Sequence, residues 1–103
     1  MAWLCFNDAF LSVVNHLSDQ RLLVVRARKA EHLRNVFGSN AEITVTPDRD
    51  YKYRTVADRK TVAKIVASRI ERIDYGNFKD SVKSHQLHDL YAEFWMLHRD
   101  YQV

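Results

Sequence analysis

Short runs of apolar residues, separated by turn-forming residues, occupy the first thirty positions and predict three β-strands. Residues 3–7 and 10–16 flank the pair Asn7-Asp8, which favours a turn, so they predict a hairpin. A short helix over the second segment is the competing interpretation. Residues 21–28 carry apolar side chains at odd and even positions alike, which is typical of a central strand with both faces covered.

The middle of the chain changes from helical to strand periodicity. Residues 29–37 place apolar side chains on one helical face and are followed by Gly38, which suits the end of a helix. Residues 43–45 and 51–56 alternate apolar and polar positions on either side of Pro47 and a polar turn. This alternation predicts a second hairpin.

Two longer amphipathic segments predict helices in the second half of the chain. Asp58 is a suitable N-cap for a helix whose apolar residues recur at helical spacing from Val62 onward. Arg69 lies within that stripe, and we expect its charged head to reach water. Ser84 can cap a final helix that has one continuous apolar face. Residues 78–83, between the two helices, predict a short connector or a single helical turn.

The predicted order is an N-terminal hairpin, strand, helix, strand, strand, helix and C-terminal helix, in a single domain that spans residues 1–103. The central β-α-β-β-α stretch predicts an α+β fold of the ferredoxin-like (split β-α-β) kind, with an antiparallel sheet covered by helices on one face. An alternative places the last helix across the other face of the sheet. The order of the elements favours the first arrangement.

Composition indicates a compact domain, and the absence of targeting segments indicates its location. The 103 residues are 47% hydrophobic and 28% charged, with only two Gly and one Pro. Cys5 is the single cysteine and excludes an internal disulfide. The sequence has no signal-peptide pattern and no apolar run of the roughly 20 residues that span a bilayer. We therefore expect a cytoplasmic protein that has no contact with a membrane.

Motifs for catalysis are absent from the sequence. It contains no G-x-S-x-G segment, and a chain with only Gly38 and Gly76 cannot build a glycine-rich phosphate loop. His85, His88 and Asp89 stand at i, i+3 and i+4 of the final helix, a spacing that suits metal ligands, so a small metal-dependent hydrolase is one alternative. Polar residues on a helix surface are the simpler interpretation. We predict no catalytic residue, metal or cofactor, and favour a function other than an enzyme's.

Positive charge is concentrated in the middle of the chain. Residues 21–72 carry thirteen Lys and Arg against six Asp and Glu, while the segments on either side each have a net charge of −2. A sheet edge and helix that present these cations would neutralise phosphates, and Tyr51 and Tyr53 would stack on bases. Cations that solvate the edges, with both tyrosines in the core, are the competing interpretation. For this alternative, a nucleic-acid-binding domain, the predicted residues are Arg26, Arg28, Lys52, Arg54 and Lys60.

The C-terminal aromatic residues indicate a protein-binding surface. Trp95 and Met96 lie beside the main apolar stripe of the final helix, so they are exposed if the helix buries only that stripe. Burial of this helix on two sides is the other interpretation. The loop before it concentrates polar and aromatic side chains, which either carry function or plug the core. The predicted protein-binding residues are Tyr75, Asn77, Phe78, Lys79, Trp95 and Met96.

Four segments of the chain resemble a group of short bacterial proteins of about 100 residues that have no assigned activity. They are residues 6–12 (FNDAFLS), 21–28 (RLLVVRAR), 73–81 (IDYGNFKDS) and 87–91 (LHDLY). The resemblance extends over nearly the whole chain. It implies a bacterial, cytoplasmic setting, and it transfers no activity and no site residue.

The sequence therefore favours a small non-enzymatic protein-binding domain, such as a regulator or inhibitor. A phage- or plasmid-encoded protein that counters a host defence is one example of this type. We expect a protein partner or a homodimer, and the alternatives are nucleic-acid binding and metal-dependent hydrolysis.

Overall fold

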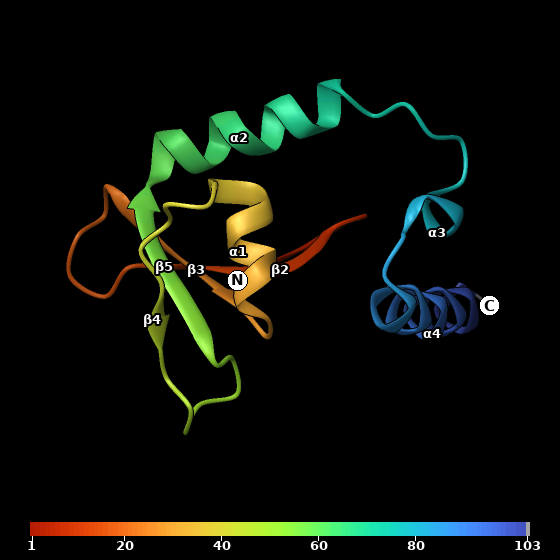
Figure 1. Cartoon of the computed structure of the whole chain (residues 1–103), viewed down its shortest axis with the longest axis horizontal. Helices are drawn as coiled ribbons and strands as arrows, with labels where there is room; N and C mark the ends of the chain where they lie inside the picture. Colours follow the sequence, from red (N-terminus) through yellow and green to blue (C-terminus); the bar gives the residue numbers. More distant parts are fainter. Residues whose placement is uncertain (103) are drawn as a thin grey trace.

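The computed structural model describes residues 1–102, which contain five strands and four helices (Figure 1). The elements are β1 (Ala2–Phe6), β2 (Ala9–Asn15), β3 (Leu22–Ala27), α1 (Ala30–Phe37), β4 (Thr44–Val45), β5 (Tyr53–Asp58), α2 (Arg59–Glu71), α3 (Phe78–Ser81) and α4 (His85–Tyr101). Both predicted hairpins are confirmed, as are the helices and their order. The strand predicted at 51–56 begins two residues later, and the predicted connector contains one helical turn, α3.

The five strands form one antiparallel sheet in the order β1-β2-β3-β5-β4. β5 lies between β3 and β4, the two strands that α1 connects. No strand follows α2 within residues 1–102, and β2 from the N-terminal hairpin is the other neighbour of β3. This order confirms the α+β class and the antiparallel sheet, but it does not confirm the predicted ferredoxin-like topology.

One face of the sheet is covered by α1 and α2, and we call it the α1–α2 face (Figure 1). Alternate residues of a strand point to opposite faces, so β2 and β3 each contribute every second residue to this core. Burial of each large apolar side chain here contributes roughly 1.5–3 kcal/mol. The buried residues of the core are Ala9, Leu11, Val25, Ala27, Leu33 and Val62.

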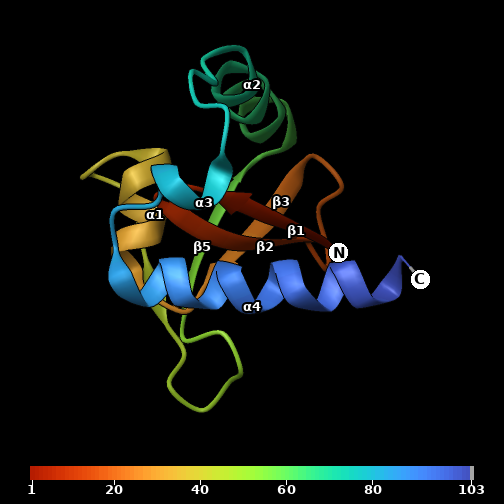
Figure 2. The ribbon, with the colours of Figure 1, turned by 90° about the vertical axis from the view of Figure 1, so that its right-hand side faces the viewer.

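The opposite face of the sheet, which we call the α4 face, is crossed by α4 (Figure 2). Phe10 lies between Ala9 and Leu11 in β2, points away from the α1–α2 core and packs instead with Leu87 and Tyr91 of α4. Helices therefore cover both faces, and the arrangement favoured from the sequence, with helices on one face, is wrong. The reason is that β2 has large apolar side chains on both of its faces.

Side-chain caps begin the helices of the second half. Asp58 accepts a hydrogen bond from the Lys60 backbone N–H at the start of α2, at 2.9 Å. Ser84 accepts one from the Leu87 N–H at the start of α4, at 3.3 Å. Asn77 plays the same role for α3. These bonds satisfy backbone donors that a helix leaves without partners, so the sequence sets where each helix begins.

The charged head of Arg69 in α2 is bound to other residues, with only 18% of the side chain exposed, whereas the prediction placed it in water. Its guanidinium donates to both carboxylate oxygens of Asp8, at 2.5 and 3.2 Å, and to the backbone carbonyl of Asn35, at 2.8 Å. Its Cζ atom also lies 5.0 Å from the centroid of the Phe6 ring. One cation thus joins α2 to the β1–β2 turn and to α1.

Candidate functional site

The two halves of α4 have different surroundings. The first half packs on the sheet through the buried Leu87 and Tyr91, whereas every residue from 95 to 101 is exposed. Figure 2 shows this second half running past the strands towards the C-terminus. The interpretation in which α4 is buried on two sides is therefore wrong. The large apolar side chains left exposed are Trp95 (52%), Met96 (51%), Leu97 (64%) and Tyr101 (92%).

A groove of about 530 Å³ lies between α4, β1 and the segment that leads into α3. Aromatic rings form much of its wall: the Phe78 and Tyr91 centroids are 5.1 Å apart, and Tyr91 and Phe94 are 6.3 Å apart. We call it the aromatic groove. Its lining includes Asn77, Phe78, Lys79, Phe94, Trp95 and His98.

Two cations flank the indole of Trp95 at the edge of this groove. Lys79 Nζ lies 5.4 Å from the ring centroid, and Arg99 Cζ lies 5.3 Å from it. Cations at this distance are attracted to the face of an aromatic ring, by about 0.5–1 kcal/mol at exposed sites. The indole is therefore held in place while about half of its surface is open to solvent.

Tyr91 secures α4 to the N-terminal hairpin beneath the groove. Its hydroxyl lies 2.9 Å from the carbonyl oxygens of both Phe6 and Ala9, and it donates to this pair. Burial raises the pKa of Tyr91 above its ordinary range, so the side chain remains a neutral donor. The floor of the groove is thus fixed to the sheet by both packing and hydrogen bonding.

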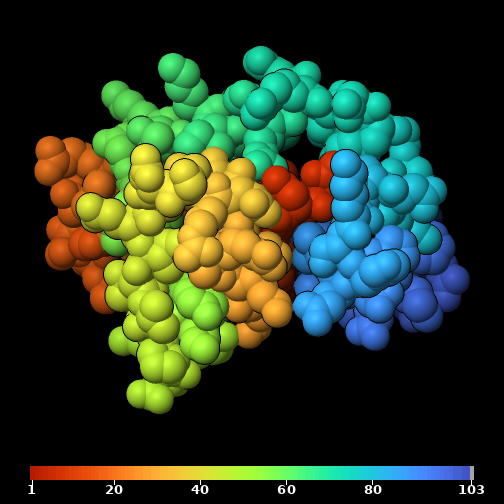
Figure 3. All heavy atoms as spheres, viewed as in Figure 1, coloured from red at the N-terminus to blue at the C-terminus, as the bar shows by residue number. Residues whose placement is uncertain are grey.

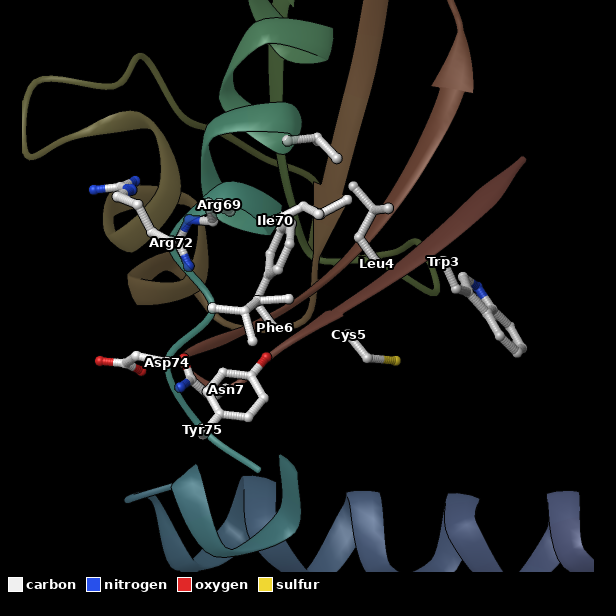
Figure 4. A pocket seen from close by; sticks show the side chains of 12 residues that line it. Trp3, Leu4, Cys5, Phe6, Asn7, Arg69, Ile70, Arg72, Asp74 and Tyr75 are labelled. Atoms are coloured by element: carbon white, nitrogen blue, oxygen red, sulfur yellow. The ribbon is translucent and has the colours of Figure 1, made fainter. Parts of the chain in front are cut away.

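A second cavity, of about 450 Å³, opens on the other side of β1 (Figure 4). It is bounded by β1, the end of α2 and the segment that follows, from which the Tyr75 ring is directed toward β1. Figure 3 shows the surface hollowed between β1 and this part of α2. Cys5 lines both cavities, and β1 is an edge strand of the sheet.

The predicted protein-binding residues lie near one another in the structure. Four of the six line the aromatic groove: Asn77, Phe78, Lys79 and Trp95. Tyr75 lines the second cavity, with its ring centroid 5.9 Å from that of Phe78. Met96 is exposed next to Trp95 and lines neither cavity. Their role in binding stays a prediction.

Sequence reasoning missed the contribution of β1 to this surface. Trp3 is 54% exposed and stacks on Phe94, with centroids 6.1 Å apart and ring planes inclined by 12°. The signal in the sequence was Trp3 itself, a large aromatic residue in a predicted hairpin strand. To predict its exposure, one must know that this strand is at the edge of the sheet, and strand order depends on pairing between distant segments.

The structure separates the residues predicted for nucleic-acid binding. Three of them gather on the α4 face: Arg26, Arg28 and Arg54. Lys60 lies in the first turn of α2, which covers the opposite face, and Lys52 Nζ lies 5.6 Å from the Tyr53 ring. Tyr51 is only 4% exposed, and Tyr53 packs against the α1–α2 core. The base stacking predicted for these two tyrosines is therefore wrong.

His85, His88 and Asp89 occupy the first turns of α4, as predicted. His88 Nδ1 lies 3.5 Å from Asp89 Oδ1, and His85 is exposed. Within residues 1–102, no three His, Cys, Asp or Glu side chains are grouped so that they could hold a metal ion. The geometry of these three residues is that of polar groups on a helix surface.

Comparison with known protein families, with curated proteins and with solved structures finds no match to this chain. None of the helices in the part of the chain that the structure describes is both long enough and apolar enough to cross a membrane. The function therefore has to be argued from the surfaces themselves.

Proposed function

We propose that this protein is a binding domain for another protein, which docks on the aromatic groove and the exposed half of α4. The observation that carries the proposal is that Trp95 and Met96 are half exposed beside a groove with aromatic walls. Trp and Met are enriched at protein interfaces, and Trp dominates the small set of residues that supply most binding energy. In the bacterial cytoplasm, such a domain would act as a regulator or inhibitor.

The exposed apolar area is large enough to matter for binding. A tryptophan side chain buries roughly 200 Å² when it is fully covered, so covering the open half of Trp95 contributes about 2–3 kcal/mol. Met96 and Leu97 are exposed next to Trp95, and covering them would add to this binding free energy. Because the groove is fixed to the sheet through Tyr91, the binding surface needs little ordering when a partner docks.

The charges at the groove indicate what the partner carries. Lys79 and His98 line the groove, and Arg99 lies over the Trp95 ring. A partner with an apolar or aromatic anchor flanked by carboxylates would fill the groove and pair with these basic groups. An interface of this type has an apolar centre and a polar rim.

Site-specific photo-crosslinking in the native host tests the proposal. A photoreactive phenylalanine at position 95 should crosslink a protein that the same group at position 64, on the exposed side of α2, does not. The captured protein, once purified, should bind the wild-type chain, and Trp95→Ala should weaken that affinity at least tenfold. Lys64→Ala is the matched control and should leave the affinity unchanged.

Two outcomes would contradict the proposal. One is that positions 95 and 64 give the same crosslinks. The other is that the purified partner binds Trp95→Ala and Met96→Ala variants as tightly as it binds the wild type. Sedimentation equilibrium over a hundredfold range of concentration identifies a homodimer, in which case the second copy is the protein partner and Trp95→Ala should dissociate it.

A further inference from the structure

A row of polar side chains crosses the whole sheet on the α4 face. The strand register places Trp3 opposite Ser12, Ser12 opposite Arg26, Arg26 opposite Arg54, and Arg54 opposite Thr44. Because directly opposed residues of neighbouring strands point to the same face, the two arginines stand side by side. Arg26 belongs to β3 and Arg54 to β5, whereas α4 packs at the β1–β2 end of the sheet.

The two central arginines of this row are partly buried without full compensation of their charge. Arg54 has a side chain that is 17% exposed, and the carboxylate paired with it, Asp50, lies 4.0 Å away and is itself 70% exposed. Burial lowers the pKa of Arg54, and the nearby charges of Arg49 and Arg26 lower it further. Arg26 Nη2 donates to Ser12 Oγ at 2.7 Å, while its buried Nε has no hydrogen-bond partner in the described residues.

Stacking on the Tyr51 ring holds the guanidinium groups of Arg26 and Arg28 in place. Arg26 Cζ and Arg28 Cζ lie 4.6 and 4.5 Å from the centroid of the Tyr51 ring. The Tyr51 hydroxyl in turn accepts a hydrogen bond from Trp3 Nε1 at 3.1 Å, and Arg28 donates to the Asp50 carbonyl at 2.6 Å. The cations are therefore positioned before any ligand arrives. Like charges directly opposite each other destabilise a sheet, so folding alone does not account for this arrangement.

We infer that the arginine cluster on the α4 face binds the phosphate backbone of a nucleic acid, through Arg26, Arg54, Arg28 and Arg49. Guanidinium groups present paired donors that match phosphate oxygens. The cations come from β3, the residue that follows it, β5 and the turn between β4 and β5. The Tyr51 ring is covered by guanidinium groups and cannot stack on bases, so recognition through the backbone is independent of sequence.

Fluorescence anisotropy with labelled 20-nucleotide single-stranded and duplex probes tests the inference. Neutralisation of about four phosphates predicts that the affinity falls roughly 150-fold between 50 and 200 mM salt. The Arg26→Gln/Arg54→Gln variant should weaken binding and lower the slope of log affinity against log salt by about two. Lys60→Gln/Lys64→Gln removes the same charge from α2, behind the sheet, and should leave the slope nearly unchanged.

A variant at an exposed position keeps the test valid if the double arginine variant does not fold. Arg49→Gln changes an exposed side chain and should lower the slope by about one. The inference is overturned if the wild type shows no salt-sensitive binding. It is also overturned if the Lys60→Gln/Lys64→Gln variant loses as much affinity and salt slope as the Arg26→Gln/Arg54→Gln variant. If polyglutamate binds with the same affinity as the nucleic-acid probes, the site is one for acidic protein segments. Displacement of the probe by equimolar inorganic phosphate would show a site for a single phosphate. Either of these results also overturns it.

Discussion

The two faces of the sheet are built by the same strands and have opposite characters. On the α1–α2 face, Leu11, Ala27 and Tyr53 stand opposite one another along β2, β3 and β5 and belong to a closed apolar core. The next row of paired residues, on the α4 face, contains a serine and two arginines. The first face specifies the fold, and the second is only partly covered, so it is the face that is free to bind other molecules.

Arginines on the two sides of the sheet show the same contrast. Arg69, on the α1–α2 side, has a carboxylate at 2.5 Å and a backbone carbonyl at 2.8 Å. Arg26 and Arg54 stand opposite each other and donate to the hydroxyls of Ser12 and Thr46, and the one carboxylate near them is the exposed Asp50, 4.0 Å from Arg54. A fully paired cation stabilises the fold, whereas cations that are positioned but not compensated have charge left for a ligand. Under the proposed binding of a nucleic acid, the degree of compensation distinguishes Arg69 from Arg26 and Arg54.

The largest expected difference between the faces is in packing. Leu33→Ala removes a side chain of α1 that is 0% exposed, and we expect it to lower the free energy of unfolding by about 3 kcal/mol. Val56→Ala, on the α4 face, removes a side chain that is 52% exposed and should lower it by less than about 1 kcal/mol. Urea denaturation measures both. Similar losses for the two variants would show that the α4 face is as closely packed as the other.

A smaller effect is expected from the carboxylates that accompany the arginines. Asp8→Asn removes the charge that pairs with Arg69 and should lower the free energy of unfolding by about 1–2 kcal/mol. Asp50→Asn, beside Arg54, should change it by less than about 0.5 kcal/mol because the pair is long and exposed. The same denaturation experiment compares them, and an equal cost for both would contradict the distinction between a compensated and an uncompensated cation.

The smallest effect comes from a residue that connects the two faces. His32 of α1 accepts a hydrogen bond at Nδ1 from the backbone N–H of Phe10, whose side chain lies on the α4 face. Burial lowers the pKa of His32 below its ordinary value of 6.5. The unfolded chain therefore takes up the proton first, so this contribution is complete above about pH 6.5 and is lost as the pH falls through the lower pKa of the folded state.

Urea titrations between about pH 7.5 and 5 measure this dependence. Wild-type stability should fall on acidification, and His32→Gln should reduce the fall. His85→Gln changes an exposed histidine and should keep the wild-type dependence. If His32→Gln and the wild type have the same pH profile, the protonation of His32 is not linked to folding.

Much of the secondary structure could be predicted because its determinants are local. Caps such as Asp58 and Ser84, and the periodicity of apolar residues after them, are readable within one turn or one strand. The start of β5 was misplaced because the Tyr51 ring packs against the guanidinium groups of Arg26, in β3, and Arg28, just after it. That contact joins residues more than twenty positions apart, and strand periodicity carries no information about it.

The candidate sites were predictable to a smaller extent. Trp95 and Met96 could be chosen because they lie beside the apolar stripe of their own helix, which is a local property. The contribution of Trp3 to the same surface, and the grouping of Arg26 with Arg54 but without Lys60, depend on which strands are neighbours. Residues brought together in this way share no pattern along the chain.

The sequence by itself thus determined the class of fold, the order of its helices and strands, and the presence of surplus aromatic and cationic side chains. Only the tertiary structure decided which face α4 covers, which strand is at the edge, and which arginines stand together. The physical reason is that periodicity and capping act between residues a few positions apart. Strand order and face, by contrast, are set by the burial of apolar area between distant segments, such as Phe10 against Tyr91.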